Sequence, residues 1–248
     1  MSARIRIKRQ KTAGNNVPTA VRPVLKEESA LKNARVWFTK DDEAKYISHL
    51  DLVRTMSRAL QQSGLPVWMT EGFHPHLFLT FPLPLSLGIC GKREAMDVKL
   101  TEDIKGFQIK EAICHCLPKG ICIFDVTEPV MPAKKISYAL YAIVCENEML
   151  SNREIENMLC SFFAKDSIPC EKKSKSGIQE IDLKEHIAEY QIIENKEKIK
   201  LLVTLSAGSK NNINPSLLLQ AIEKEYKTEF FWKITRCGLY NEKMEPFR

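Results

Sequence analysis

The sequence lacks several features that would assign a function directly. No run of about 18 apolar residues occurs in its 248 residues, so we expect no transmembrane helix and no membrane partner. Its first residues lack the apolar core of a secretory signal, which favours a cytoplasmic protein. A phosphate-cradling glycine loop, a nucleophile elbow and zinc-finger spacing are also missing, and these absences exclude the most readily identified nucleotide-binding, hydrolase and zinc-finger classes.

Cysteine and histidine are present, but their spacing does not favour a disulfide framework or a metal site. The eight cysteines are scattered through apolar segments, which is typical of reduced, mostly buried thiols. The Cys-His-Cys segment at 114–116 offers two sulfurs, but alternate residues of a helix point about 200° apart, so we interpret Cys116 as a core residue. His49, His74 and His76 could supply three nitrogens. No spacing requires an ion, and we expect no metal or other cofactor.

The net charge is concentrated at the amino terminus. Residues 1–33 hold eight basic residues against two glutamates, a net charge of +6, whereas the other 215 residues balance at 29 basic and 29 acidic. This segment shows no hydrophobic period, so we expect a disordered basic tail. Two interpretations of the tail stay open: an arm that contacts RNA phosphates or an acidic partner, and a solubilising extension.

The sharpest local signals fall between residues 45 and 100. Ser48 and Asp51 form a capping-box pattern that predicts the start of a helix. Gly64 and Pro66 predict its end, because glycine favours the left-handed conformation and proline forbids continuation. Apolar residues recur at helical spacing between these limits, at Leu52, Val53, Met56, Ala59 and Leu60.

Short alternating segments follow this helix. They predict strands at residues 67–70, 77–81, 85–89 and 96–100. Gly72 and Pro75 make the segment between the first two strands a turn. Pro82 and Pro84 interrupt the pattern, because proline cannot donate to a sheet ladder.

The order of the predicted elements indicates the fold class. A strand at 34–38, the helix, the strands above, a second helix beginning at 101–103 and a strand at 121–126 give the order β-α-β-β-α-β, which is the ferredoxin-like arrangement. After a linker at 131–135, the order recurs. The predicted elements of the second copy are a strand at 138–144, a helix with a capping box from Ser151, a polar loop at 171–177, strand-like runs at 178–193 and 199–205, a helix at 214–226 and a strand at 230–235.

We therefore expect an α+β protein with two tandem ferredoxin-like (βαββαβ) domains, each with an antiparallel sheet. The predicted domains are residues 34–130, which carry the SHLDL and EGFHP motifs, and residues 136–248.

Three segments of the first predicted domain closely resemble the radical-SAM-linked family of uncharacterised proteins. They are SHLDLVRTMSRAL, GLPVWMTEGFHPHLFLTFPLPLSLGI and AMDVKL, and Thr70 and His74 stand where serine and asparagine are commoner in that family. The resemblance spans roughly residues 34–240. It implies a radical-SAM enzyme, encoded nearby, as a partner. Nothing here resembles the three-cysteine cluster site of those enzymes, so this chain would serve that chemistry from outside.

The first functional hypothesis is a non-catalytic accessory protein that binds RNA, such as tRNA or rRNA, or presents a substrate to the radical-SAM enzyme. Two arginines share one face of the predicted helix, and nearby aromatic residues offer stacking surface. DNA is not expected. The candidate RNA-binding or partner surface comprises Arg54, Arg58, Glu71, Phe73, His74, His76, Lys92 and Arg93.

The second hypothesis is a metal-independent endoribonuclease. Histidine with tyrosine can move protons to and from a phosphodiester, and the candidates are His49, Tyr46 and His74, with Lys45 beside them. The fold also shows a distant similarity to tandem ferredoxin-like endoribonucleases that cut CRISPR repeat RNA. Catalysis requires these side chains to converge in one open cleft, whereas an accessory protein does not.

Overall fold

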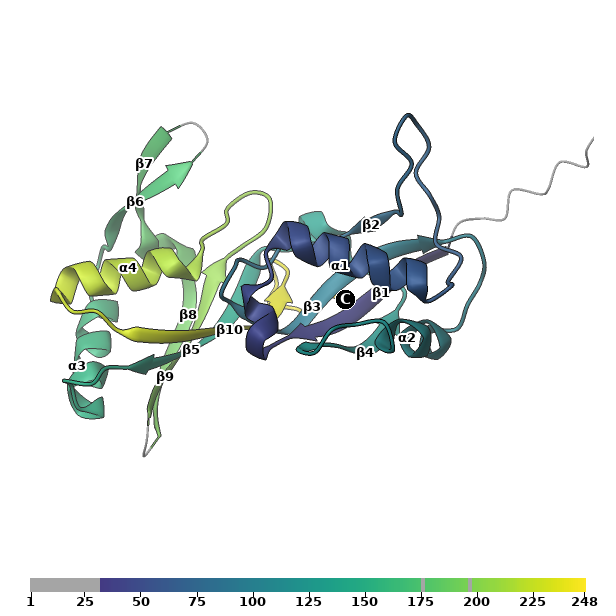
Figure 1. Ribbon diagram of the computed structural model, residues 1–248. Coiled ribbons are helices and arrows are strands. Elements are labelled where there is room, and N and C mark those ends of the chain that lie inside the picture. Colours follow the sequence, from purple (N-terminus) through teal and green to yellow (C-terminus); the bar gives the residue numbers. More distant parts are fainter. Residues whose placement is uncertain (1–31, 175–176, 196–197) are drawn as a thin grey trace, which may run out of the picture.

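The computed structural model describes residues 32–174, 177–195 and 198–248, and it shows a mixed α+β protein with one large, mostly antiparallel sheet (Figure 1). Residues 1–31 of the predicted basic tail lie outside these ranges. The described strands are β1 (Lys32–Lys40), β2 (Leu79–Thr80), β3 (Cys90–Leu100), β4 (Ile121–Thr127), β5 (Tyr138–Glu146), β6 (Pro169–Ser174), β7 (Gly177–Asp182), β8 (Ile187–Asn195), β9 (Lys198–Ser206) and β10 (Phe231–Tyr240). The described α-helices are α1 (His49–Gln62), α2 (Gly106–Cys114), α3 (Asn152–Phe163) and α4 (Pro215–Tyr226), and the 3-10 helices are η1 (Asp42–Tyr46), η2 (Ala133–Lys135) and η3 (Leu183–His186).

The first unit, from β1 to β4, has the strand order β4-β1-β3, and β2 pairs with the other end of β3. All these pairs are antiparallel. Alternate side chains of β1 and β3, such as Val36, Phe38, Met96 and Val98, join apolar residues of α1 and α2 in one buried core. Both helices therefore cover the same face of this sheet, as the period of two along a strand requires.

The second unit, from β5 to β10, has the strand order β10-β5-β9-β8, again antiparallel throughout. The β6–β7 hairpin is inserted between α3 and β8. The core of the second unit combines one face of β5 and β9 with apolar residues of α3 and α4, including Ile143, Leu159, Leu201 and Leu218.

The two units share one continuous sheet. β10 pairs in parallel with the start of β3, with Thr235 opposite Cys90 and Arg236 opposite Gly91. The same edge of β3 pairs with β2 further along, at residues 97–98. Strand β3 therefore pairs with β2 of its own unit along one part of this edge and with β10 of the second unit along another part.

The predicted helix starts are largely confirmed. The Ser48 hydroxyl accepts a hydrogen bond from the Asp51 N–H at 3.2 Å and donates to the Asp51 carboxylate at 2.7 Å. Ser151 begins α3 with a complete capping box, and Asn214 caps α4 directly before a proline. The turn after α1 contains Gly64 with φ of +69°, in the left-handed region where glycine is favoured.

The strands predicted between residues 67 and 89 are wrong in extent. In the described residues, only Leu79–Thr80 forms a strand in this range, and Val67 and Met69 make isolated bridges. Residues 85–89 form no strand, because their backbone groups find other partners, such as the Gly88 N–H that donates to the Lys45 carbonyl at 2.9 Å. Proline and turn residues leave too few ladder donors here for a regular sheet.

Four further expectations require correction. The helix predicted from 101–103 begins at Gly106, because the Thr101 N–H and hydroxyl both donate to the Pro66 carbonyl and tie this residue to the segment that follows α1. In the predicted loop at 171–177, the described residues 171–174 and 177 lie in the paired strands β6 and β7. The strand predicted at 178–193 is divided by η3, and β10 continues to Tyr240, beyond the predicted end.

Candidate nucleic-acid interface

The face of the first sheet opposite α1 and α2 carries both aromatic rings and cations, and part of it is buried, because Arg35 and Trp37 are each 1% exposed. β1 and β3 alternate, so Val36 and Met96 enter the helical core while their neighbours Trp37 and Ala95 are register partners on the other face. Arg35 and Asp97 are register partners on this same face. This face therefore presents a set of side chains distinct from the helical core.

At the start of β3, Arg93 lies over two aromatic rings. Its guanidinium carbon is 4.3 Å from the Trp37 ring centroid and 6.0 Å from that of Phe124. The Trp37 indole is itself fixed, because its N–H donates to the Thr127 hydroxyl at 2.9 Å. Arg93 is exposed, so its charge is held at the surface by the rings beneath it.

At the other end of β3, Lys99 lies beside two further rings. Its Nζ is 4.5 Å from the Phe78 ring centroid and 5.2 Å from the Trp68 centroid. Lys99 and Phe78 also line a groove of about 350 Å³ between β2, β3 and residues 129–132. We call the two groups together the basic-aromatic strip, which comprises Trp37, Trp68, Phe78, Arg93, Lys99 and Phe124.

The middle of this face is closed by a buried ion pair and by the carboxyl-terminal segment. Arg35 donates to the Asp97 carboxylate through Nε at 2.6 Å and Nη2 at 2.8 Å. Its guanidinium carbon lies 4.2 Å from the Phe247 ring centroid, and Phe247 packs edge-to-face against Trp37. The strip therefore has its two cations at opposite ends of β3, about 20 Å apart at the usual strand rise.

Residues 68–78, which we call the arm, project from the sheet edge near β2 (Figure 1). The Trp68 N–H donates to the Lys99 carbonyl at 2.8 Å, which attaches the arm to β3. Within the arm, the Thr70 N–H donates to the His76 carbonyl at 2.8 Å and the Phe78 N–H donates to the Trp68 carbonyl at 2.9 Å. The predicted turn is therefore the tip of a hydrogen-bonded finger.

The structure does not bring the predicted surface residues into one patch. Arg54 and Arg58 are exposed on α1, which covers the other face of the sheet, and Arg54 pairs with Asp51 at 3.1 Å. Lys92 pairs with Asp41 at 2.6 Å, at the opposite end of β3 from the arm. The arm carries the predicted residues Glu71, Phe73, His74 and His76, all exposed. Of the predicted set, only Arg93 belongs to the basic-aromatic strip.

His49, the leading acid-base candidate, is half-buried at the start of α1. Its ring packs edge-to-face against Phe81 at 5.3 Å, and its Nδ1 is buried with no hydrogen-bond partner in the described part of the chain. Burial, and then the positive charge of Lys40, lower the pKa of His49 below its usual 6.5. Tyr46 is exposed and lies under the Lys45 ammonium.

The two histidines of the arm take part in the hydrogen bonds of its turn. The His76 Nδ1 lies 3.0 Å from the Thr70 hydroxyl oxygen and 3.1 Å from the His74 carbonyl oxygen, and the His76 N–H donates to the same hydroxyl at 3.1 Å. Within the described ranges, no hydrogen bond joins His49 to Tyr46 or His74.

A buried polar group at the junction of the units was not predicted from the sequence. Arg236 pairs with Glu94 through Nε at 3.0 Å and through Nη2, and it also donates to the carbonyls of Leu83 at 2.7 Å and Pro84 at 3.2 Å. The Leu-Pro-Leu-Pro segment thus caps a guanidinium. Lys40 is fully buried nearby, and desolvation lowers its pKa although Glu94 acts in the opposite direction. The signal that the sequence offered was Glu94, an acidic residue just before the strand predicted at 96–100.

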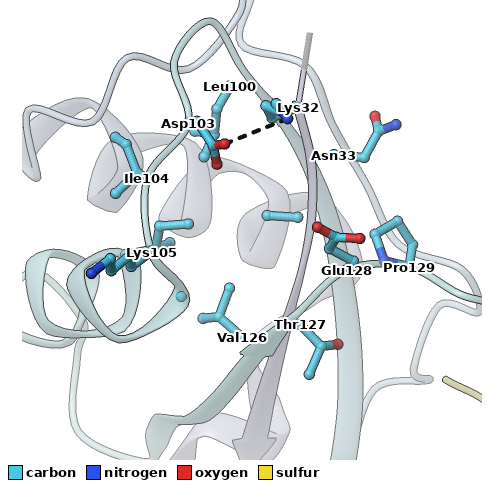
Figure 2. A pocket seen from close by; sticks show the side chains of 13 residues that line it. Lys32, Asn33, Leu100, Asp103, Ile104, Lys105, Val126, Thr127, Glu128 and Pro129 are labelled. Carbon is cyan, nitrogen blue, oxygen red and sulfur yellow. Dashed lines mark ion pairs between the residues drawn. The ribbon is translucent and has the colours of Figure 1, made fainter.

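A hollow of about 490 Å³ lies where β1, β4 and the start of α2 meet (Figure 2). Figure 2 shows Lys32 facing Asp103, and their charged atoms are 3.5 Å apart. Lys105 and Glu128 add one further charge of each sign. With both signs present, the lining gives no preference for a phosphate.

The cysteines are free thiols with mixed exposure. Cys90 and Cys145 are buried, Cys122 and Cys160 are exposed, and the other four are half-buried, so the expectation of mostly buried thiols is only partly met. Cys116, which we interpreted as a core residue, is half-buried and packs against the core of the first unit, so this prediction is met in part. No group of three or more His, Cys, Asp or Glu in the described residues is arranged to hold a metal ion. None of the described helices has the length and apolar character needed to cross a membrane.

Comparisons with known proteins give one family. The model of the family described as "uncharacterized protein conserved in bacteria (DUF2344)" matches residues 33–215. A search of curated proteins finds no match. Among solved structures, the crystal structure of an unknown protein from Galdieria sulphuraria is similar over 83% of this chain and 98% of that chain, with 14% identity and a TM-score of 0.24. A TM-score this low carries no argument about fold or function.

Proposed function

The chain belongs to the family of uncharacterized proteins conserved in bacteria, DUF2344, and from this premise we propose that it is a non-catalytic accessory protein that binds RNA through its basic-aromatic strip. The observation that carries the proposal is the pairing of each cation of the strip with two rings: Arg93 with Trp37 and Phe124, and Lys99 with Trp68 and Phe78.

The chemistry of the strip suits single-stranded RNA. Unstacked bases stack on aromatic side chains and on guanidinium planes, while lysine and arginine neutralise phosphates. The Arg93 guanidinium is exposed and the rings of Trp68, Phe78 and Phe124 are half-buried, so these groups are open to such contacts. Trp37 is 1% exposed and serves only to support Arg93 from below.

At the usual strand rise, Arg93 and Lys99 lie about 20 Å apart along β3. A single strand of RNA needs several nucleotides to cover this distance. The groove beside Lys99 and Phe78 gives a bounded site at one end.

The fold supports the same proposal. We assign the two units to tandem ferredoxin-like domains, at residues 34–130 and 136–248, because each has the order βαββαβ with the last strand beside the first, once the β6–β7 hairpin inserted in the second unit is set aside. RNA-recognition modules also use aromatic side chains on a four-stranded sheet to stack bases. The likeness to these modules is one of fold alone.

The partner in this proposal comes from the sequence. Resemblance to the radical-SAM-linked family implies a nearby radical-SAM enzyme, to which the accessory protein would present a bound tRNA or rRNA. A catalytic role has less support, because His49 packs on Phe81 while His74 and His76 belong to the arm.

Binding of fluorescently labelled total tRNA to the full chain tests the proposal. We expect the Arg93→Gln/Lys99→Gln variant to bind at least tenfold more weakly and to show a shallower dependence of log K on log salt, because each phosphate contact to a single strand contributes a slope of about 0.7. The matched control is Lys165→Gln/Lys210→Gln, which removes two cations of the second unit, one half-buried and one exposed, and should change affinity less than twofold.

Equal affinity of wild type and Arg93→Gln/Lys99→Gln would contradict the proposal. The same RNA, incubated without divalent metal and examined for cleavage, tests the nuclease hypothesis. Cleavage that is lost in His49→Ala would replace the accessory role with the endoribonuclease role.

A further inference from the structure

Phe73 stands at the tip of the arm with its whole side chain in solvent. Its relative exposure is 102%, above that of any other large apolar residue in the described part of the chain. Full exposure of a phenyl ring is unfavourable in water, and such a ring gains free energy when another surface covers it. Neither of the two hydrophobic cores in the described part of the chain includes it or packs against it.

The arm holds this ring away from the sheet in a defined position. Thr70 and His76 bond through both backbone and side chain, and Trp68 packs on Phe78 at 5.6 Å between ring centroids. Gly72 has φ of +128°, a conformation that side-chain-bearing residues rarely adopt. Because the backbone is already ordered, binding through the tip loses little conformational entropy.

The charge of the tip favours a protein over RNA. Residues 69–77 include Glu71 and contain no lysine or arginine, so the tip lacks the permanent positive charge that neutralises phosphates, and the ring of His76 is bound to Thr70 and to the His74 carbonyl. An aromatic side chain that enters an apolar pocket is a common anchor of protein interfaces. A carboxylate beside such an anchor favours a pocket with basic groups at its rim.

We propose that the arm is a docking finger for a second protein, and that Phe73 enters an apolar pocket with a basic rim on that partner. The Lys99 end of the strip lies at the base of the arm and the tip lies beyond it. The same chain therefore holds RNA and a protein partner at separate surfaces. Docking through the tip does not depend on RNA binding by the strip.

Site-specific photo-crosslinking tests this inference. p-Benzoylphenylalanine replaces Phe73 in the full chain, in cells that naturally carry this protein, and the matched control places the same probe at Phe107, an exposed phenylalanine on α2. We expect one discrete protein adduct from position 73 that is absent from position 107. An adduct with RNA only, the same adduct from both positions, or no adduct overturns the inference.

Binding of the purified crosslinked protein to defined variants completes the test. We expect Phe73→Ser to weaken binding at least tenfold and Phe73→Leu to restore it to within threefold of wild type, while Phe107→Ser leaves it unchanged. Binding unaffected by Phe73→Ser overturns the inference. Affinity for tRNA measured on Phe73→Ser should equal that of wild type, so loss of docking and loss of RNA binding remain distinguishable.

Discussion

Glu94 on β3 and Arg236 on β10 form a buried ion pair across the junction of the two units. Their side chains are only 4% and 2% exposed. The other guanidinium donors reach the Leu83 and Pro84 carbonyls. Arg236 of β10 therefore binds both β3 and the proline segment of the first unit. The pair holds β10 against β3, where the two units join in one continuous sheet.

Removal of one partner should be strongly destabilising. We expect Arg236→Met to lower the free energy of unfolding by about 3–5 kcal/mol, because it leaves a buried, uncompensated carboxylate. Urea unfolding followed by circular dichroism measures the change. Lys210→Met, which breaks the exposed Lys210–Glu242 pair, is the control and should lower it by less than about 1 kcal/mol. Similar effects of the two substitutions would contradict a structural role for the buried pair.

The cap of α3 provides a second prediction. Ser151→Ala removes the hydroxyl that accepts the Glu154 N–H and should lower the free energy of unfolding by about 1 kcal/mol. Ser161→Ala changes an exposed serine of the same helix, where alanine has the higher helix propensity, and should not destabilise. Equal losses from the two variants, measured by thermal unfolding, would argue against the cap.

The hydrogen bonds that Asp182 accepts should make the stability of the fold depend on pH. Its carboxylate accepts the Ile168 N–H at 2.7 Å and the Lys184 N–H at 2.9 Å, and these bonds, with one from Ser167, lower its pKa below 3.8. A carboxylate with a lowered pKa stabilises the fold above its unfolded-state pKa, and this stabilisation is lost as the pH falls through the lowered value. The difference in Tm between wild type and Asp182→Asn should therefore be constant near neutral pH and shrink below about pH 4. A difference that persists unchanged to pH 2 would contradict this account.

His49 should be neutral at pH 7. Burial and the charge of Lys40 lower its pKa, so its NMR titration midpoint should fall below 6.5. Lys40→Met removes a neighbouring positive charge and should raise that midpoint. Because the folded state holds this proton less tightly than the unfolded state, His49 lowers stability as the pH falls from 6.5 through the folded-state pKa. A midpoint above 6.5 in wild type would contradict the buried position of the ring.

Local sequence signals predicted the helices well and the irregular segments poorly. The side chains of Ser48, Ser151 and Asn214 each accept a hydrogen bond from a backbone N–H only two or three residues further along the chain. Capping patterns in the sequence therefore located three of the four described α-helix starts. The start of α2 was missed because Thr101 is held by Pro66, a residue 35 positions away. The division of β8 from β7 likewise depends on Asp182 binding the Ile168 N–H.

The candidate site was harder to predict than the fold. Arg93 and Lys99 acquire their setting from rings on other strands and on the arm, and these pairings depend on strand register. The sequence placed Arg54 and Arg58 correctly on an exposed helix face, but it did not show that this helix lies across the sheet from the strip. Which face of a sheet the helices cover is a property of the tertiary structure.

The divided edge of β3 makes this protein a natural candidate for fragment complementation. A chain cut within residues 131–135 would yield two pieces, one with the free edge of β3 at residues 90–91 and one with the matching edge of β10. Each piece would also carry one half of the Glu94–Arg236 pair. Unpaired strand edges recruit other strands. The complementary charge makes the true counterpart the preferred one, so the two halves, produced separately, should reassemble into the continuous sheet and report on the proximity of any proteins fused to them.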